Sequence, residues 1–134
     1  MLLRKHSSLT WLKLTGESVK DRTLSEIASL KDVYYLSLCK TKITDEGLKS
    51  LPGLGNVKIL DVGSTDTTDS GLLQIAKLSN LYALKLDGTK VTDDGMLTLA
   101  DLKGLRYLYV SRTRVTDKGK NALKALLPDL EFKK

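Results

Sequence analysis

The chain has 134 residues, 41% of them hydrophobic and 28% charged, a length and balance that predict one globular domain. Two prolines and one cysteine exclude collagen-like, proline-rich disordered and disulfide-stapled proteins. The 22 Lys and Arg residues outnumber the 16 Asp and Glu residues, which permits attraction to acidic partners, but the basic residues form no long run. No stretch approaches the roughly 20 apolar residues of a membrane span, so we expect no membrane partner.

Self-similarity at a fixed spacing organises most of the chain. The segment that begins at Val33 aligns with the one that begins at Leu81, an offset of 48 residues or two units of 24. Residues 9–128 form five such repeats without a linker, and we number the positions of each repeat from 1 to 24. The repeats begin at Leu9, Val33, Val57, Leu81 and Leu105. We therefore predict a single repeat domain over residues 1–134.

Residues 1–8 precede the first complete repeat. Met1 corresponds to position 17, inside a helix, so we interpret these residues as the partial remnant of a preceding repeat. This interpretation predicts that the chain is a fragment of a longer protein. Two alternatives stay open: Leu2 and Leu3 form a natural cap, or two chains pack end to end through the first repeat.

Within each repeat the apolar spacing changes from that of a strand to that of a helix. Positions 4 and 6 alternate as in a short strand, whereas positions 16, 19 and 22 recur as on one helix face. Between them, Thr-Asp pairs such as Thr68-Asp69 offer side-chain oxygens to cap the helix start. A glycine two residues later, such as Gly71, allows the first turn to lie close to the neighbouring repeat. Pro52 is expected to shorten the helix of the second repeat.

The C-terminal segment departs from the repeat pattern. Lys120 replaces the apolar residue of position 16, as expected for a last repeat with no neighbour to cover. Residues 129–134 are predicted to form a C-terminal cap, in which Leu130 and Phe132 fold over the final repeat.

The pattern Leu-x-x-Leu-x-Leu-x-x-Thr-x-Ile/Val-Thr-Asp-x-Gly-Leu resembles the leucine-rich repeat, in the 24-residue variant common in bacterial proteins, over about nine-tenths of the chain. It is also similar to the cysteine-containing repeats of eukaryotic F-box proteins. However, those repeats carry Cys, and other leucine-rich repeats Asn, at the positions of Thr41, Thr65, Thr89 and Thr113. The resemblance implies an α/β fold, namely a right-handed leucine-rich-repeat solenoid with a parallel concave β-sheet and convex helices. It also implies a function in binding other proteins.

Aromatic residues gather on one predicted face. Because positions 4 and 6 point into the core, positions 3 and 5 project from the opposite side of each strand, with positions 2, 7 and 8 beside them. All five tyrosines and the only tryptophan fall at positions 2, 3 and 5, and such side chains dominate binding hot spots. We therefore predict a non-catalytic protein–protein interaction scaffold with an aromatic, mildly basic binding face. Its predicted partner-binding residues are Trp11, Lys13, Tyr34, Tyr35, Lys58, Ile59, Tyr82, Lys85, Arg106, Tyr107, Tyr109 and Arg112.

Two other interpretations of this face stay open. Its lysines and arginines would equally contact phosphates, which makes a nucleic-acid or other polyanion-binding module the alternative function. The face would instead be satisfied internally if neighbouring rings stacked on one another and position 2 formed a cation–π series. The residues of that series are Tyr34, Lys58, Tyr82 and Arg106. An ion pair between Asp61 and Lys85 in adjacent repeats would have the same effect.

The sequence gives no sign of catalysis, and we expect no enzyme activity, no cofactor and no metal. It lacks the usual phosphate-binding, dinucleotide-binding and zinc-binding motifs. His6 and Cys39, the single histidine and cysteine, lie in different parts of the repeat array, which disfavours a nucleophile pair. The recurring Asp of position 13 is explained better by helix capping than by calcium. A single thiol fits a reducing compartment, and we expect a cytoplasmic location.

Overall fold

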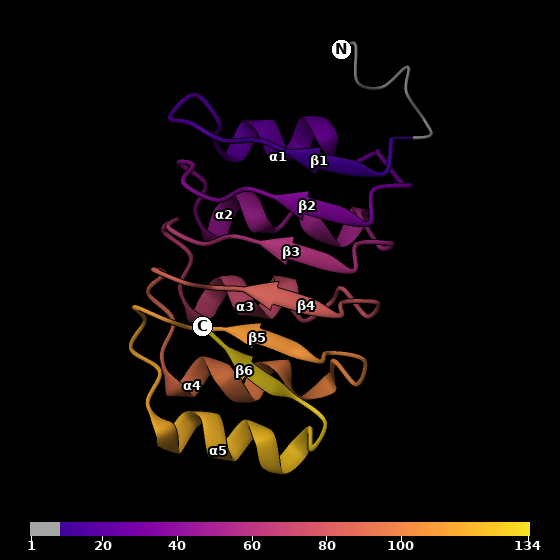
Figure 1. Cartoon of the computed structure of the whole chain (residues 1–134). Coiled ribbons are helices and arrows are strands. Elements are labelled where there is room, and N and C mark those ends of the chain that lie inside the picture. The colour runs from indigo at the N-terminus through magenta and orange to yellow at the C-terminus, as the bar shows by residue number, and fades with distance from the viewer. Residues whose placement is uncertain (1–8) are drawn as a thin grey trace.

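Each repeat folds into one short strand followed by a helical segment in the computed structural model, which describes residues 9–134 (Figure 1). The strands are β1 (Trp11–Lys13), β2 (Tyr35–Ser37), β3 (Ile59–Asp61), β4 (Ala83–Lys85), β5 (Tyr107–Tyr109) and β6 (Glu131–Lys133). The α-helices are α1 (Asp21–Ile27), α2 (Asp45–Leu48), α3 (Asp69–Ile75), α4 (Asp93–Met96) and α5 (Asp117–Leu126). The 3₁₀ segments η2 (Leu51–Gly53) and η3 (Leu97–Asp101) follow α2 and α4.

The strands form one parallel sheet whose spatial order, β1-β2-β3-β4-β5-β6, is their order in the sequence. The register advances by one repeat per strand, so that Leu36 faces Leu60 and Leu60 faces Leu84. Parallel neighbours require a crossover, and here each helical segment provides it on the same side of the sheet (Figure 1). This confirms the predicted right-handed α/β solenoid with a concave sheet and convex helices.

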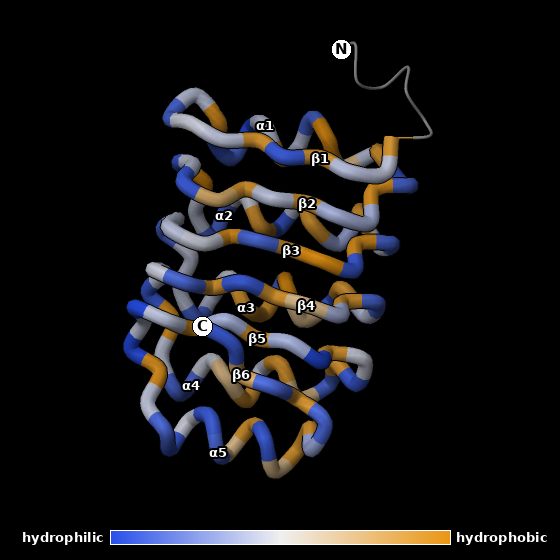
Figure 2. The backbone as a smooth tube through the Cα atoms, viewed as in Figure 1, coloured by the Kyte–Doolittle hydropathy of each residue, from blue (hydrophilic) through white to orange (hydrophobic). Residues whose placement is uncertain are grey.

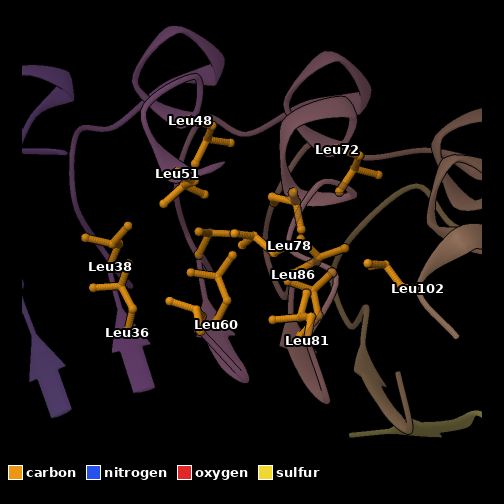
Figure 3. Close-up of a cluster of buried hydrophobic side chains, with 14 of the residues drawn as sticks. Leu36, Leu38, Leu48, Leu51, Leu60, Leu72, Leu78, Leu81, Leu86 and Leu102 are labelled. Atoms are coloured by element: carbon orange, nitrogen blue, oxygen red, sulfur yellow. The ribbon is translucent and has the colours of Figure 1, made fainter. Parts of the chain in front are cut away.

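The core lies between the sheet and the helices. Leu36, Leu60 and Leu84 at position 4 are fully buried, as are the residues of position 6 in the same repeats. Leucines from the helical side, such as Leu48 and Leu72, meet them in one continuous cluster (Figure 3). Hydrophobic residues, in orange, recur among hydrophilic ones along the whole stack of repeats (Figure 2). Each buried leucine contributes roughly 1.5–3 kcal/mol, which makes the stack of repeats the main source of stability.

The turn after each strand repeats one backbone conformation. Position 8 lies in the left-handed region in every repeat, and its occupants are Gly16, Lys40, Ser64, Gly88 and Arg112, with φ from 53° to 103°. At position 9 the threonine hydroxyl turns back and donates to the backbone carbonyl three residues earlier, at 2.6–2.7 Å. The threonines at the positions that carry Cys or Asn in other leucine-rich repeats therefore close this turn.

Thr and Asp at positions 12 and 13 divide two tasks between them. Thr44, Thr68 and Thr92 cap their own helices, since each hydroxyl accepts a backbone N–H two residues later at 3.2–3.3 Å. The aspartate instead accepts the backbone N–H and the hydroxyl of the threonine in the next repeat, 23 residues on. We call these contacts the Asp–Thr pairs: Asp21–Thr44, Asp45–Thr68, Asp69–Thr92 and Asp93–Thr116. The prediction of capping is thus confirmed for Thr44, Thr68 and Thr92 and wrong for Thr116, whose side chain caps no backbone N–H, whereas the aspartates connect repeats.

The glycine of position 15 makes room for these pairs. A Cβ atom built on Gly71 would collide with the Asp45 carboxylate and would lie 2.7 Å from a methyl carbon of Leu48. At the equivalent glycines of the second, fourth and fifth repeats, a Cβ atom would likewise collide with the position-13 aspartate of the preceding repeat. The predicted close approach of the first helical turn to the neighbouring repeat is therefore confirmed.

The helical segments differ in length between repeats. In the second repeat the α-helix ends at Leu48 and Pro52 lies in η2, but the fourth repeat, which has no proline, shows the same short α-helix followed by η3, so Pro52 alone does not explain the shortening. At the C-terminus β6 pairs in parallel with β5 and extends the sheet. Leu130 is fully buried and Phe132 packs partly against the core, while Leu126 is 51% exposed.

Residues 1–8, with the expected partial repeat and the Leu2 and Leu3 cap, lie outside the described residues. Within residues 9–134, no helix combines the length and the apolar character that crossing a bilayer requires.

Candidate partner-binding face

The outward side of the sheet carries the residues at positions 2, 3 and 5, which we call the concave face. Because the strands pair in register, equal positions of neighbouring repeats stand about 4.8 Å apart. Position 3 reads Trp11, Tyr35, Ile59, Ala83, Tyr107 and Glu131 from β1 to β6. The face therefore has aromatic residues towards both ends and aliphatic residues between them.

Two rings stack at the β1 end. The centroids of Trp11 and Tyr35 lie 4.8 Å apart, and their planes differ by 6°. Direct register pairing of these residues places the rings side by side. Trp11, the outer residue of the stack, is still 51% exposed. It therefore presents a large apolar surface and an indole N–H to solvent. This stack, Trp11 on Tyr35, is the most exposed aromatic feature of the concave face.

A second aromatic group lies near β5. Tyr82 and Tyr107 meet edge to face, with centroids 5.4 Å apart and planes at 75°. The side-chain interaction with Tyr107 raises the pKa of the Tyr82 phenol above its ordinary value. Lys133 lies over the Tyr107 ring at 5.4 Å, and Lys85 lies over the Tyr109 ring at 5.0 Å. Aromatic surface at this end is thus partly covered by neighbouring side chains.

Between the stack and β4 the surface is hollowed. The cavity, of about 360 Å³, is lined by the charged residues Lys13, Lys40, Lys85 and Asp61. We call this cavity the lysine hollow; its other lining residues are Thr15, Tyr35, Ser37 and Cys39. Lys13, Asp61 and Lys85 occupy position 5 of their repeats, whereas Lys40 reaches the hollow from the left-handed turn after β2.

The expected internal contacts of the face are present only in part. The stacking of neighbouring rings is observed. Asp61 and Lys85 stand directly opposite each other in register, but no ion pair forms between them among residues 9–134. The expected cation–π series along position 2 is also not observed in the described chain, where Lys85, Lys120 and Lys133 supply the cations that lie over rings.

The remaining predicted residues lie at the borders of the face. Tyr34 and Lys58 are exposed at position 2, immediately before β2 and β3. Arg106 is exposed before β5 and donates from Nε to the carbonyl oxygen of Asp129 at 3.3 Å. Arg112 is exposed in the left-handed turn after β5, and it lines none of the features described above. The structure therefore brings together the β1 and β2 rings with Lys13 and Lys85, and leaves Arg112 apart.

Cys39 and the recurring aspartates are the groups that the sequence raised for nucleophilic and metal chemistry. Burial, and then the Asp61 carboxylate, raise the pKa of the Cys39 thiol, so less of the reactive thiolate is present at neutral pH. His6 lies outside the described residues. Within residues 9–134 no group of three or more His, Cys, Asp or Glu side chains is placed to hold a metal ion. The recurring aspartates are engaged by threonines instead.

Two features of the face were not predicted. Position 8 was expected beside the face, but neither its left-handed conformation nor the hollow that Lys40 lines was foreseen, although Gly16 and Gly88 at the same position were an available signal for the turn. The sixth strand, which brings Lys133 onto the Tyr107 ring, follows a segment that lacks the leucine spacing of the repeats.

Comparisons with known proteins agree with this architecture. No protein-family model matches the chain, and no curated protein matches it. Among solved structures, an internalin (inlF) from Listeria monocytogenes is 25% identical to this chain, with a TM-score of 0.80. The alignment covers 97% of this chain and 36% of the internalin chain. Internalin C2 from the same organism is 27% identical with a TM-score of 0.75, covering 95% and 52%. A leucine-rich-repeat protein from Leptospira interrogans, at 20% identity and a TM-score of 0.63, shares the fold.

This chain spans only about a third to a half of the length of those solved structures. With repeated strand and helix units, a parallel sheet and these structural neighbours, the chain is a leucine-rich-repeat protein.

Proposed function

We propose that this leucine-rich-repeat chain is a non-catalytic scaffold that binds a protein partner on its concave face. The observation that carries the proposal is the Trp11–Tyr35 stack, in which a tryptophan keeps half of its surface exposed while its ring is already held by a neighbour. Burying such a pre-ordered ring costs little side-chain entropy, so most of the gain from the buried area is available for binding.

The location of the exposed aromatics supports the same face. Trp11, Tyr34 and Tyr82 are the strongly exposed aromatic residues of the described chain, and all three belong to the concave face. On the helical side the large exposed hydrophobic residues are leucines, such as Leu73 and Leu97. Leucine is under-represented among residues that dominate binding energy, whereas tryptophan and tyrosine are enriched.

The size of the face limits the partner. Six strands at about 4.8 Å and five residues at about 3.3 Å give roughly 29 by 17 Å, near 500 Å² in projection. A stable interface between folded proteins needs about 800 Å² on each side. A short segment of a partner therefore fits the face of this chain better than a complete domain.

Selection of binding peptides tests the proposal. A displayed library of random peptides is selected on the protein, and each recovered peptide is then measured against Trp11→Ala and Tyr35→Ala variants. We expect binding to weaken about tenfold or more in these variants and to remain unchanged in Leu73→Ala and Leu97→Ala, which are matched exposed sites on the helical side. Equal affinity for all four variants contradicts the proposal.

Polyanion binding is the competing function, favoured by the formal net charge of +6. Its marker is salt: binding that depends on several phosphate contacts falls by orders of magnitude between 50 and 200 mM salt. Binding carried by the Trp11–Tyr35 stack would change far less. A cytoplasmic location is part of the proposal and rests on the single cysteine.

A further inference from the structure

We propose that the lysine hollow binds a side-chain carboxylate from an acidic segment of the partner, and that the Trp11–Tyr35 stack receives an apolar side chain of the same segment. The inference rests on the proposed function and specifies the chemistry of its ligand.

The charges of the residues around the hollow are unbalanced. Three lysines, Lys13, Lys40 and Lys85, and one aspartate, Asp61, line it, and the Lys85 ammonium lies at its border, over the Tyr109 ring. Among residues 9–134 none of these lysines lies within 4 Å of a carboxylate. Asp61 is already engaged, because its Oδ1 accepts the backbone N–H of Gly63 at 2.9 Å. The hollow therefore has two positive charges in excess and donors free to receive an anionic oxygen.

The spacing of the two features matches an extended peptide. On a strand, positions 3 and 5 lie on the same face about 6.6 Å apart. An extended peptide that follows the strands presents its own alternate side chains at the same interval. An acidic residue in the hollow would thus place the residue two positions away over Trp11 or Tyr35, which predicts the order acidic, any, apolar or its reverse.

A peptide carboxylate fits the hollow better than a nucleic-acid backbone. A single negative charge is compatible with the neighbouring Asp61, whereas a run of phosphates would bring several negative charges close to that carboxylate.

The chain carries a natural reporter for each feature. Trp11 is the only tryptophan, so its fluorescence reports on the stack. Cys39 is the only cysteine and lines the hollow, so its rate of alkylation reports on occupancy. A bound carboxylate slows alkylation twice over, because it covers the thiol and because its charge disfavours the thiolate.

The experiment compares two probes on the full chain. The first is the peptide acetyl-Gly-Glu-Gly-Phe-Gly-Glu-Gly-amide, and the second is the same peptide with Gln in place of Glu. Trp11 fluorescence and the alkylation of Cys39 by neutral iodoacetamide are titrated with each peptide at 150 mM KCl. We expect the acidic peptide to bind at least about tenfold more tightly, the amount that one charge-assisted hydrogen bond supplies.

Variants assign the preference to the hollow. The double variant Lys13→Gln/Lys85→Gln should lose the preference for the acidic peptide. Lys77→Gln, at an exposed lysine after α3, should keep it. Circular dichroism establishes that each variant is folded before it is titrated.

Three results would overturn the inference: equal binding of the two peptides, an unchanged preference in the double variant, or stronger protection of Cys39 by oligouridylate than by the acidic peptide. If the two peptides bind equally but still depend on Trp11, only the carboxylate assignment fails. If neither these peptides nor the selected ones depend on Trp11, the proposed function fails with it.

Discussion

Removing one aspartate of the Asp–Thr pairs should destabilise the solenoid far more than removing an ordinary surface aspartate. In Asp69→Ala the backbone N–H of Thr92 loses its acceptor at 2.8 Å and the Thr92 hydroxyl loses one at 2.5 Å. A hydrogen bond to a charged group contributes roughly 1.5–3 kcal/mol. The hydroxyl rotates to find water because Thr92 is only half-buried, whereas the N–H is fixed in direction. We therefore expect a loss of about 2–4 kcal/mol.

Asp66→Ala in the same repeat is the matched control. This substitution also removes one negative charge. Within residues 9–134, however, the Asp66 carboxylate forms an ion pair only with Lys90, at 3.3 Å, and both side chains are exposed. Such a pair contributes about 0–1 kcal/mol. Urea unfolding followed by circular dichroism measures both free energies of unfolding, and coincidence with the Trp11 fluorescence transition tests whether unfolding is two-state. Losses that differ by less than about 0.5 kcal/mol would refute the inter-repeat role of Asp69.

The remaining predictions concern the packing, the acid response and the orientation of the strands. Gly95→Ala should lower the free energy of unfolding in urea by about 2 kcal/mol or more, because the added Cβ would collide with the carboxylate of Asp69 in the preceding repeat. Gly55→Ala, with open space around the glycine, should change it little. Hydrogen bonds from the Thr116 hydroxyl, and then from the Thr116 backbone N–H, lower the pKa of Asp93 below its ordinary value of 3.8. The stability it contributes is therefore present above pH 3.8 and lost as the pH falls through the lowered pKa, and thermal melts of Asp93→Asn should show a smaller acid-induced decrease. Leu84→Ala should cost about 2–5 kcal/mol and Lys85→Ala under 1 kcal/mol; equal losses would mean that the inward and outward sides are reversed.

The periodic parts of the fold were predictable because the same pattern of apolar positions recurs in each repeat. The alternation at Leu36 and Leu38 defines a strand only weakly on its own, but its recurrence every 24 residues also fixes the parallel register. The place of each ring on the concave face followed from that register alone.

What the sequence did not reveal are contacts that depend on backbone geometry between repeats. Thr68-Asp69 has the composition of a helix cap, and only the distance to the next repeat assigns the carboxylate to Thr92. Similarly, Lys40 occupies a left-handed turn that its own residue type disfavours, so only the glycines at the same position of other repeats point to this conformation. The stacking of Trp11 on Tyr35, by contrast, was an open alternative at the level of sequence and is observed.

The contacts between repeats also set the length of segment, 24 residues, by which the chain can be extended or shortened. In each of the four Asp–Thr pairs the aspartate binds a threonine 23 residues later, and β1 to β5 each pair with a strand 24 residues later. Duplication or excision of 24 residues within the repeat array would therefore regenerate contacts of the same kind across the junction. Recombination can lengthen or shorten this protein in steps of about 4.8 Å, and each step adds or removes one set of outward residues without disturbing the interior.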